Sequence, residues 1–98
     1  MKENKEDFVK DAIERGVPDY TADSLARYVF DGIMPGGFLT AVLENNLMEA
    51  FGQADNANSS AMKEIVTFIY NCVPSHCHGT SKKVCAWMEE RQRDRTAC

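Results

Sequence analysis

Apolar residues recur at helical spacing through most of the chain, so the pattern predicts helices. The first predicted helix covers residues 5–15 and ends at Gly16. The second is capped by Thr21 and ends at Gly32. Their apolar faces consist of Phe8, Val9, Ala12 and Ile13 in the first helix and Leu25, Tyr28 and Val29 in the second.

The same spacing continues to the C-terminal end. A third helix is predicted over residues 37–53. Asp55 is a suitable cap for a fourth, which Pro74 terminates, and a fifth begins near Thr80 or Ser81. The residues predicted to face inward are Phe38, Leu39, Val42, Leu43, Leu47 and Phe51 in the third helix, Met62, Ile65, Val66, Ile69 and Tyr70 in the fourth, and Val84, Trp87 and Met88 in the last.

Five short helices with connections of about three to eight residues are typical of a compact all-α bundle. The chain of 98 residues is predicted to form one such domain, with a tail that frays from about Asp94. The sequence holds no apolar run of membrane-spanning length, so no membrane partner is expected. The N-terminal residues are acidic and lack the apolar segment of a signal peptide. We therefore expect a cytoplasmic protein.

The net charge of the chain limits the classes of molecule that it is expected to bind. Fifteen Asp and Glu residues against 11 Lys and Arg give a net charge of −4. Binding to bulk DNA or RNA needs clustered cations to contact phosphates, so this class of partner is disfavoured. The sequence shows no carboxylate pair, metal motif or nucleophile elbow, so neither enzymatic activity nor a cofactor is predicted.

The loop Pro35-Gly36-Gly37 before the third helix is the first candidate site. The first N–H groups of a helix have no internal partner, and the helix dipole favours an anion there. Arg27 would add a bidentate phosphate partner and Tyr28 a flat face for a base. The loop lacks the spacing and the lysine of a Walker A motif. These residues predict an anion or nucleotide cradle, and the alternative is a tight turn with a solvated arginine.

A second helix start has a similar composition. Thr80, Ser81, Lys82 and Lys83 follow Gly79 in the first turn of the last predicted helix. Two cations there oppose the helix dipole unless an anion offsets them. This conflict points to an anionic ligand held by Thr80, Ser81 and Lys83. The alternative is a tolerated mismatch on the surface.

Sulfur and imidazole groups gather between the last two predicted helices, at Cys72, His76, Cys77, His78 and Cys85. The spacing C-x3-H-C-H-x6-C matches no standard zinc finger. In a reducing compartment these cysteines are better interpreted as free thiols, with Cys72 and Cys85 in the core. No metal site is predicted, and a zinc site at this cluster stays an alternative.

The segment from about Ala26 to Trp87, about two-thirds of the chain, resembles a group of small phage and prophage proteins. The shared residues are Arg27-Tyr28, Gly32, Pro35-Gly36, Phe38-Leu39-Thr40-Ala41-Val42-Leu43, Asn45-Asn46-Leu47, Ala54-Asp55, Asn58, Tyr70-Asn71, Pro74, Cys77, Gly79, Lys83-Val84 and Trp87. Those relatives carry an aromatic residue where His78 stands and an acidic one where Lys82 stands. These differences weaken a zinc site at His78 and make the argument from Lys82 particular to this chain.

The resemblance implies a phage or prophage setting, and hence the cytoplasm of a host cell. A small non-enzymatic phage protein acts by binding. We expect a counter-defence sponge or inhibitor that sequesters a nucleotide signal or blocks a host immune component. The alternative is a helical adaptor or regulator that works through protein or DNA contacts. The modest core also permits a homo-oligomer, such as a dimer or a larger ring.

Overall fold

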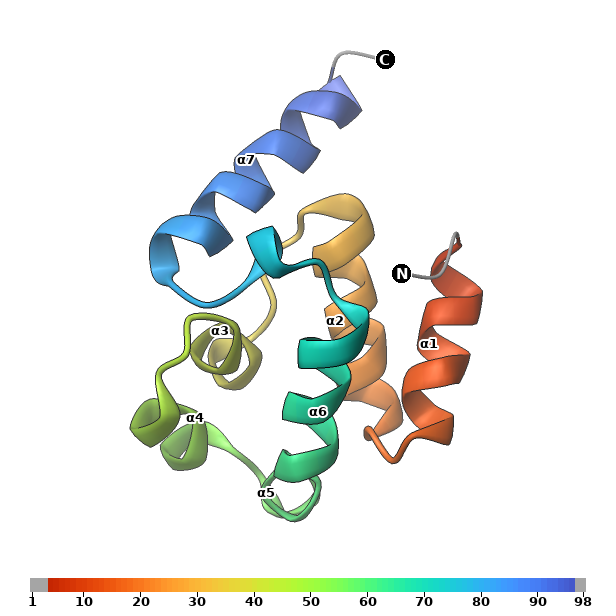
Figure 1. The fold of residues 1–98 in the computed structure, drawn as a ribbon, viewed down its shortest axis with the longest axis vertical. Coiled ribbons are helices and arrows are strands. Elements are labelled where there is room, and N and C mark those ends of the chain that lie inside the picture. Colours follow the sequence, from red (N-terminus) through yellow and green to blue (C-terminus); the bar gives the residue numbers. More distant parts are fainter. Residues whose placement is uncertain (1–3, 97–98) are drawn as a thin grey trace.

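The regular secondary structure of the described chain is helical, which confirms the predicted all-α class. The computed structural model describes residues 4–96, and the side chains of residues 4–93. This part has seven α-helices, one 3-10 turn and no strand (Figure 1). In chain order the elements are α1 (Lys5–Glu14), α2 (Asp19–Asp31), α3 (Gly37–Leu43), α4 (Leu47–Gln53), α5 (Asn56–Ser60), α6 (Met62–Cys72), η1 (Ser75–Cys77) and α7 (Ser81–Thr96).

The helices surround α2, which runs through the middle of the molecule (Figure 1). α1 packs along α2, and α3 with α4 occupies the opposite side. α5 leads into α6, and α7 crosses the C-terminal end of α2 and contacts η1. This arrangement leaves α4 and α6 facing each other across one side of the protein.

Three phenylalanines join α1, α2 and α6 at the centre of the core. Phe8 is fully buried, and its ring meets those of Phe30 and Phe68 edge to face at centroid distances of 5.5 and 5.1 Å. Edge-to-face contacts at this range add to the gain from burial alone. The other large, fully buried side chains are Tyr28, Leu25, Leu43, Ile65, Val29, Val84 and Cys77.

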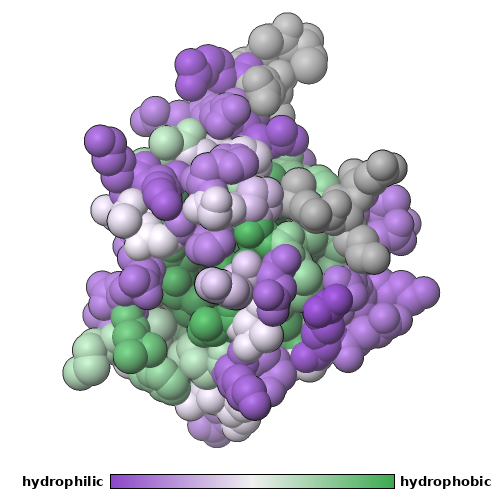
Figure 2. Space-filling view, in the orientation of Figure 1, coloured by the Kyte–Doolittle hydropathy of each residue, from purple (hydrophilic) through white to green (hydrophobic). Residues whose placement is uncertain are grey.

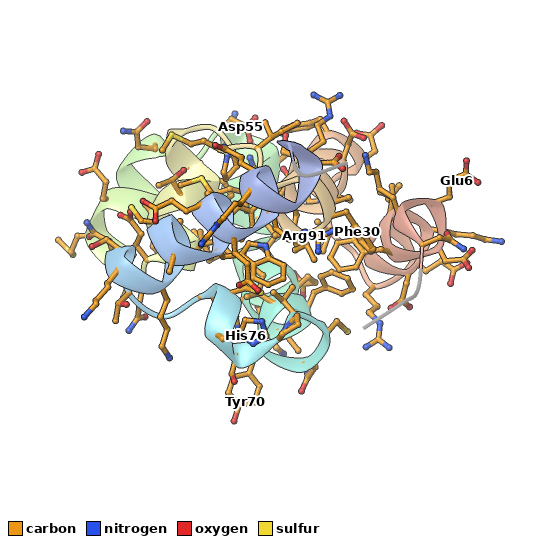
Figure 3. The ribbon with its side chains drawn as sticks, turned by 90° about the horizontal axis from the view of Figure 1, so that it is seen from above. Glu6, Phe30, Asp55, Tyr70, His76 and Arg91 are labelled. Atoms are coloured by element: carbon orange, nitrogen blue, oxygen red, sulfur yellow. The ribbon has the colours of Figure 1, made fainter. Side chains whose placement is uncertain are left out.

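Hydrogen bonds to carbonyls at the end of α2 hold α7 in place. The indole N–H of Trp87 donates to the carbonyl of Tyr28 at 3.2 Å. Arg91 donates through Nε and Nη2 to the carbonyl of Phe30 at 3.1 and 2.7 Å, and Figure 3 shows the two residues side by side. The carbonyl of Tyr28 also accepts from the N–H of Gly32 at 3.0 Å. The carbonyl of Phe30 is among the last of α2, which lack partners within the helix, so the bonds from Arg91 satisfy a group that α2 leaves open.

Gly32 makes this close approach possible. It adopts the left-handed conformation at φ 70° directly after α2, which confirms the predicted helix stop. A Cβ at this position would lie 2.6 Å from Cβ of Arg91 and 3.0 Å from the carbonyl oxygen of Met88. Both the backbone conformation and the contact with α7 therefore require glycine here.

The number of helices differs from the prediction of about five, because two predicted helices are each divided. The helix expected over residues 37–53 is α3 followed by α4. The fourth expected helix is α5 followed by α6, with a break at Ala61. Asp55 is confirmed as a cap, since its side chain accepts from the N–H of Asn58 at 2.8 Å, but it caps the short helix α5.

The start of α2 also differs from the prediction. The helix begins at Asp19, and Thr21 lies within its first turn instead of capping it. Thr21 is buried, and its hydroxyl donates to the side-chain oxygen of Asn58 at 2.5 Å. This buried contact joins α2 to α5. The hydroxyl therefore bonds to a side chain of another helix instead of to a free N–H group at the start of α2.

The last helix, α7, is the longest of those described, with 16 residues. Its backbone is helical to Thr96, and residues 97–98 lie outside the described part, so fraying of the tail from about Asp94 stays a prediction. Among the described helices, none is both long and apolar enough to cross a membrane.

Candidate ligand-binding site

A pocket of about 320 Å³ opens between α4 and α6. Figure 2 shows this side of the molecule, where a hydrophobic area lies among hydrophilic side chains. The lining residues are Val42, Asn45, Asn46, Leu47, Ala50, Met62, Val66, Ile69, Tyr70, His78 and Gly79. A concave, mainly apolar pocket with a few polar groups is the usual form of a small-molecule site.

The turn between α3 and α4 shapes one wall of this pocket. Asn45 adopts the left-handed conformation at φ 64°, which asparagine tolerates better than most residues. Its N–H donates to the carbonyl of Val42 at 3.0 Å, and that of Asn46 donates to the carbonyl of Ala41 at 2.8 Å, as in a Schellman motif. The Asn46 side chain then accepts from the N–H of Glu49 at 3.4 Å and caps α4. The two asparagines thus end one helix and start the next.

One face of α6 forms the opposite wall. Met62 and Ile69 are buried there, whereas Val66 and Tyr70 lie at the opening with 45% and 79% of their surface exposed. These positions are three or four residues apart, so their side chains share one side of the helix. Figure 3 shows Tyr70 pointing out from the body of the protein. Leu47 of α4 is 63% exposed and contributes to the other rim.

The loop before α7 supplies polar groups to the lining. The N–H of Gly79 donates to the carbonyl of Leu43 at 2.7 Å, which fixes the loop to the end of α3. Nε2 of His78 is buried and has no hydrogen-bond partner within the described chain. Burial lowers the pKa of His78, a hydrogen bond to the backbone of Val73 opposes that shift, and the charge of Lys83 lowers the pKa further. Burial and the charge of Lys83 therefore both favour the neutral form of this imidazole.

The first turn of α7 is the cationic feature beside the pocket. The hydroxyl of Thr80 accepts from the N–H of Lys83 at 3.1 Å, so the helix begins where the sequence predicts. The N–H groups of Ser81 and Lys82 have no partner inside the helix. The Lys83 side chain folds back over Gly79, where its Nζ would lie 3.8 Å from a Cβ. Within the described residues, its ammonium group forms no ion pair.

The predicted cradle at Pro35, Gly36 and Gly37 lies at another place. Pro35 is buried, and its carbonyl accepts from the hydroxyl of Thr40 at 3.1 Å. Gly36 is open, because a Cβ added there would meet no atom within 4 Å, whereas a Cβ at Gly37 would lie 2.8 Å from Oε1 of Gln53. The helix that follows, α3, has only seven residues. The loop therefore connects two helices with little space for a ligand at Gly37.

The two predicted helix starts do not meet within one chain. Gly79 is bonded to Leu43, the last residue of α3, whereas Gly36 precedes the first residue of that helix. At 1.5 Å per residue, the length of α3 separates them by about 10 Å. The pocket is thus joined to the first turn of α7 and not to the Pro35-Gly36-Gly37 loop.

Arg27 and Tyr28 lie as the apolar periodicity and the solvated-arginine alternative predict, and not as parts of a ligand cradle. Arg27 is exposed on α2 and pairs with Asp23 at 2.7 Å. Tyr28 is fully buried, and its hydroxyl donates to the carbonyl of Cys77 at 2.6 Å. Burial raises the pKa of Tyr28. The prediction that Tyr28 presents its ring to a base is wrong, because the ring belongs to the core.

The cysteine and histidine cluster does not form a metal-binding arrangement. Among the described residues, no group of three His, Cys, Asp or Glu side chains is placed to hold a metal ion. Cys77 is buried, and burial raises the pKa of its thiol to about 12. Cys72 is half-buried and Cys85 is exposed, so the prediction of a core position is wrong for Cys85, which lies on the outer side of α7. The ring of His76 packs edge-on against Trp87 at 5.1 Å. The geometry therefore gives the zinc alternative no support.

Sequence reasoning missed most of the pocket. The periodicity places Leu47, Phe51, Val66 and Tyr70 on inward faces, yet 45–79% of each side chain is exposed. That prediction is wrong for Leu47 and Phe51 because the break at Asn45 turns α4 away from the direction of α3. It is wrong for Val66 and Tyr70 because they face the pocket that α4 leaves open. Comparisons with family models, curated proteins and solved structures found no match for this chain.

Proposed function

We propose that this chain is a non-enzymatic binding protein that holds a nucleotide in the pocket between α4 and α6. The observation that carries the proposal is the pocket itself, with apolar walls on both sides and the cationic start of α7 at its edge. Its volume of about 320 Å³ lies at the small end of the range for ligand sites. A single base with its sugar suits that size better than a larger ligand.

The walls suit a flat heterocycle. Val66 and Ile69 offer an apolar surface from α6, and Leu47 with Ala50 offers one from α4. Tyr70 lies at the opening, where an exposed aromatic ring is available to stack on a base. Such stacking contributes about 1–3 kcal/mol per base and tolerates every base. These walls therefore favour a nucleobase without selecting one.

The first turn of α7 suits the phosphate. The N–H groups of Ser81 and Lys82 lack intrahelical partners, and the hydroxyl of Ser81 lies beside them in the sequence. Lys83 adds an ammonium group that folds over Gly79, a lining residue of the pocket. Free N–H groups at a helix start and a nearby cation are a common combination for phosphate binding. This retains Thr80, Ser81 and Lys83 as candidate ligand residues.

The biological role follows from binding without turnover. In the phage setting that the sequence resemblance implies, such a protein would act in the host cytoplasm as a counter-defence sponge for a nucleotide signal. An inhibitor of a host immune component belongs to the same proposal. Sequestration needs only sufficient affinity for the nucleotide and enough copies of the protein. A binding pocket without catalytic groups is therefore sufficient for this role.

A helical adaptor is the second candidate, and exposed hydrophobic side chains favour it. Leu47, Met48 and Phe51 on α4 are 63%, 84% and 48% exposed, and Val66 and Tyr70 continue this surface on α6. Large exposed apolar residues that cluster mark protein interaction sites. The same surface suits a host protein or another copy of this chain. The net charge of −4 weakens the form of this proposal that contacts DNA.

The decisive experiment measures nucleotide binding by calorimetry and by thermal shift. The probes are AMP, GMP, CMP and UMP, together with cyclic AMP and cyclic GMP. A bound ligand at 100 times its Kd should stabilise the fold by about 2.7 kcal/mol. Val66→Trp fills the pocket and should abolish binding. Ile33→Trp is the matched control, because Ile33 is 42% exposed, similar to Val66, and does not line the pocket.

Two results would overturn the proposal. One is the absence of binding by every probe, which would leave the adaptor as the better candidate. The other is normal binding by a folded Val66→Trp variant, which would place the ligand outside the pocket. Mass spectrometry of material released from the purified protein by heat tests independently for a ligand acquired in the cell.

A further inference from the structure

Among the described residues, the positive charge that the structure places against the pocket lining comes from Lys83 and from the start of α7. Lys83 folds over Gly79, and the N-terminus of α7 adds the equivalent of about half a charge. We infer that, if the proposed function holds, the pocket selects nucleotides with one or two negative charges, either monophosphates or phosphodiesters, and discriminates against triphosphates. The inference rests on that function and adds a charge limit to it.

The pocket lining supplies no further cation. None of its residues is a lysine or an arginine, and its only histidine is His78. Burial and the nearby charge of Lys83 lower the pKa of His78 and so favour its neutral form. The lining therefore offers dipoles and one neutral imidazole but nothing that neutralises a second or third phosphate.

Lys82 does not add a second positive charge to the edge of the pocket where Lys83 lies. Neighbouring residues of an α-helix are about 100° apart around its axis, so the two side chains leave α7 in different directions. Only Lys83 is close to Gly79, and only Lys83 acts on the imidazole of His78. Lys82 is consequently a control of equal charge in the same helical turn.

Acidic residues near the turn between α3 and α4 strengthen the discrimination against highly charged ligands. Glu44 directly precedes Asn45 at the end of α3, and Glu49 lies in the first turn of α4. The whole chain carries a net charge of −4. A triphosphate brings about four negative charges to a surface that has few cations to receive them, so each extra phosphate adds repulsion.

The test is a series of ligands with one base and increasing charge, measured by calorimetry with EDTA present to remove divalent cations. The adenine series is adenosine, cyclic AMP, AMP and ATP, and the guanine series is the equivalent set. We expect AMP or cyclic AMP to bind about fivefold more tightly than adenosine, and ATP to bind about tenfold more weakly than AMP. These factors correspond to one gained and two uncompensated exposed charge contacts.

Variants at the two lysines test which side chain causes the preference for AMP over adenosine. Lys83→Ala should bring the affinity for AMP down to that for adenosine and leave adenosine unchanged. Lys82→Ala should keep the preference for AMP. Neither change is expected to unfold the protein, since both side chains are exposed.

The outcomes separate the two proposals. Binding of ATP as tightly as AMP, or an unchanged preference for AMP in Lys83→Ala, overturns the charge limit while the pocket function stands. Failure of every member of both series, nucleosides included, overturns the proposed function and the charge limit together. Weak ATP binding with loss of the AMP preference only in Lys83→Ala supports the inference.

Discussion

Replacement of Gly32 by alanine should weaken the fold strongly, because two independent costs meet at this residue. A non-glycine residue in the left-handed conformation costs about 1–2 kcal/mol. The added methyl would also lie 2.6 Å from Cβ of Arg91 and 3.0 Å from the carbonyl oxygen of Met88, so α7 must move. Such a movement strains the two hydrogen bonds from Arg91 to Phe30. Together these costs amount to about 2–4 kcal/mol.

Urea unfolding, followed by the fluorescence of Trp87, measures this loss. Trp87 is the only tryptophan of the chain. It lies on α7 and is buried against α2, so its fluorescence reports on the contact that the methyl group disturbs. Each 1 kcal/mol corresponds to about 4–8 °C in Tm for a domain of this size. A melting temperature lower by at least about 8 °C is therefore expected for Gly32→Ala.

Gly36→Ala is the matched control, four residues further along the same loop. Gly36 has φ −63°, and a Cβ there would meet no atom within 4 Å. This change should alter the stability by less than about 1 kcal/mol, because the reduced freedom of the unfolded chain is opposed by the loss of a favourable N-cap residue of α3. Equal stability of the two variants would refute the described contact between Gly32 and α7.

Three further measurements test the core and the site. Thr21→Val removes the donor of a buried side-chain hydrogen bond and should cost about 1–3 kcal/mol in urea unfolding, whereas Thr67→Val on the exposed side of α6 should be neutral. The pKa of His78 is lowered from 6.5, chiefly by burial, so the unfolded state takes up its proton first as the pH falls. Stability of the wild type should therefore decrease relative to His78→Phe below about pH 6.5, and a constant difference between pH 5 and 8 would contradict this. Iodoacetamide should label exposed Cys85 well before buried Cys77, whose thiol pKa is about 12, in peptide mass spectrometry of the native protein.

Local signals account for the parts of the fold that the sequence predicted. Gly16 and Gly32 both adopt positive φ at helix ends, and Asp55 and Thr80 both accept hydrogen bonds from backbone N–H groups three residues on. These signals act over a few residues, so they are visible without knowledge of tertiary contacts. The cap assigned to Thr21 was wrong because a residue 37 positions away supplies its partner.

The division of the third predicted helix was not visible, because the apolar spacing continues through it. Val42, Leu47 and Phe51 suit one helix over residues 37–53 as well as two shorter ones. Asparagine at position 45 replaces the glycine that usually marks a Schellman ending, so the strongest sequence signal for a stop is absent. The break is visible in the structure as the left-handed conformation of Asn45 and the pair of hydrogen bonds to Ala41 and Val42.

The pocket follows from that break, which explains why it could not be predicted from periodicity. In one continuous helix, Leu47 would continue the buried stripe of Leu39 and Leu43. The left-handed turn at Asn45 changes the direction of the chain, so Leu47 lies 63% exposed at the rim and α4 leaves a hollow against α6. A core-forming stripe has thus become the lining of a cavity. An apolar surface that the fold exposes in this way costs stability, and a ligand or partner that covers it would recover that cost.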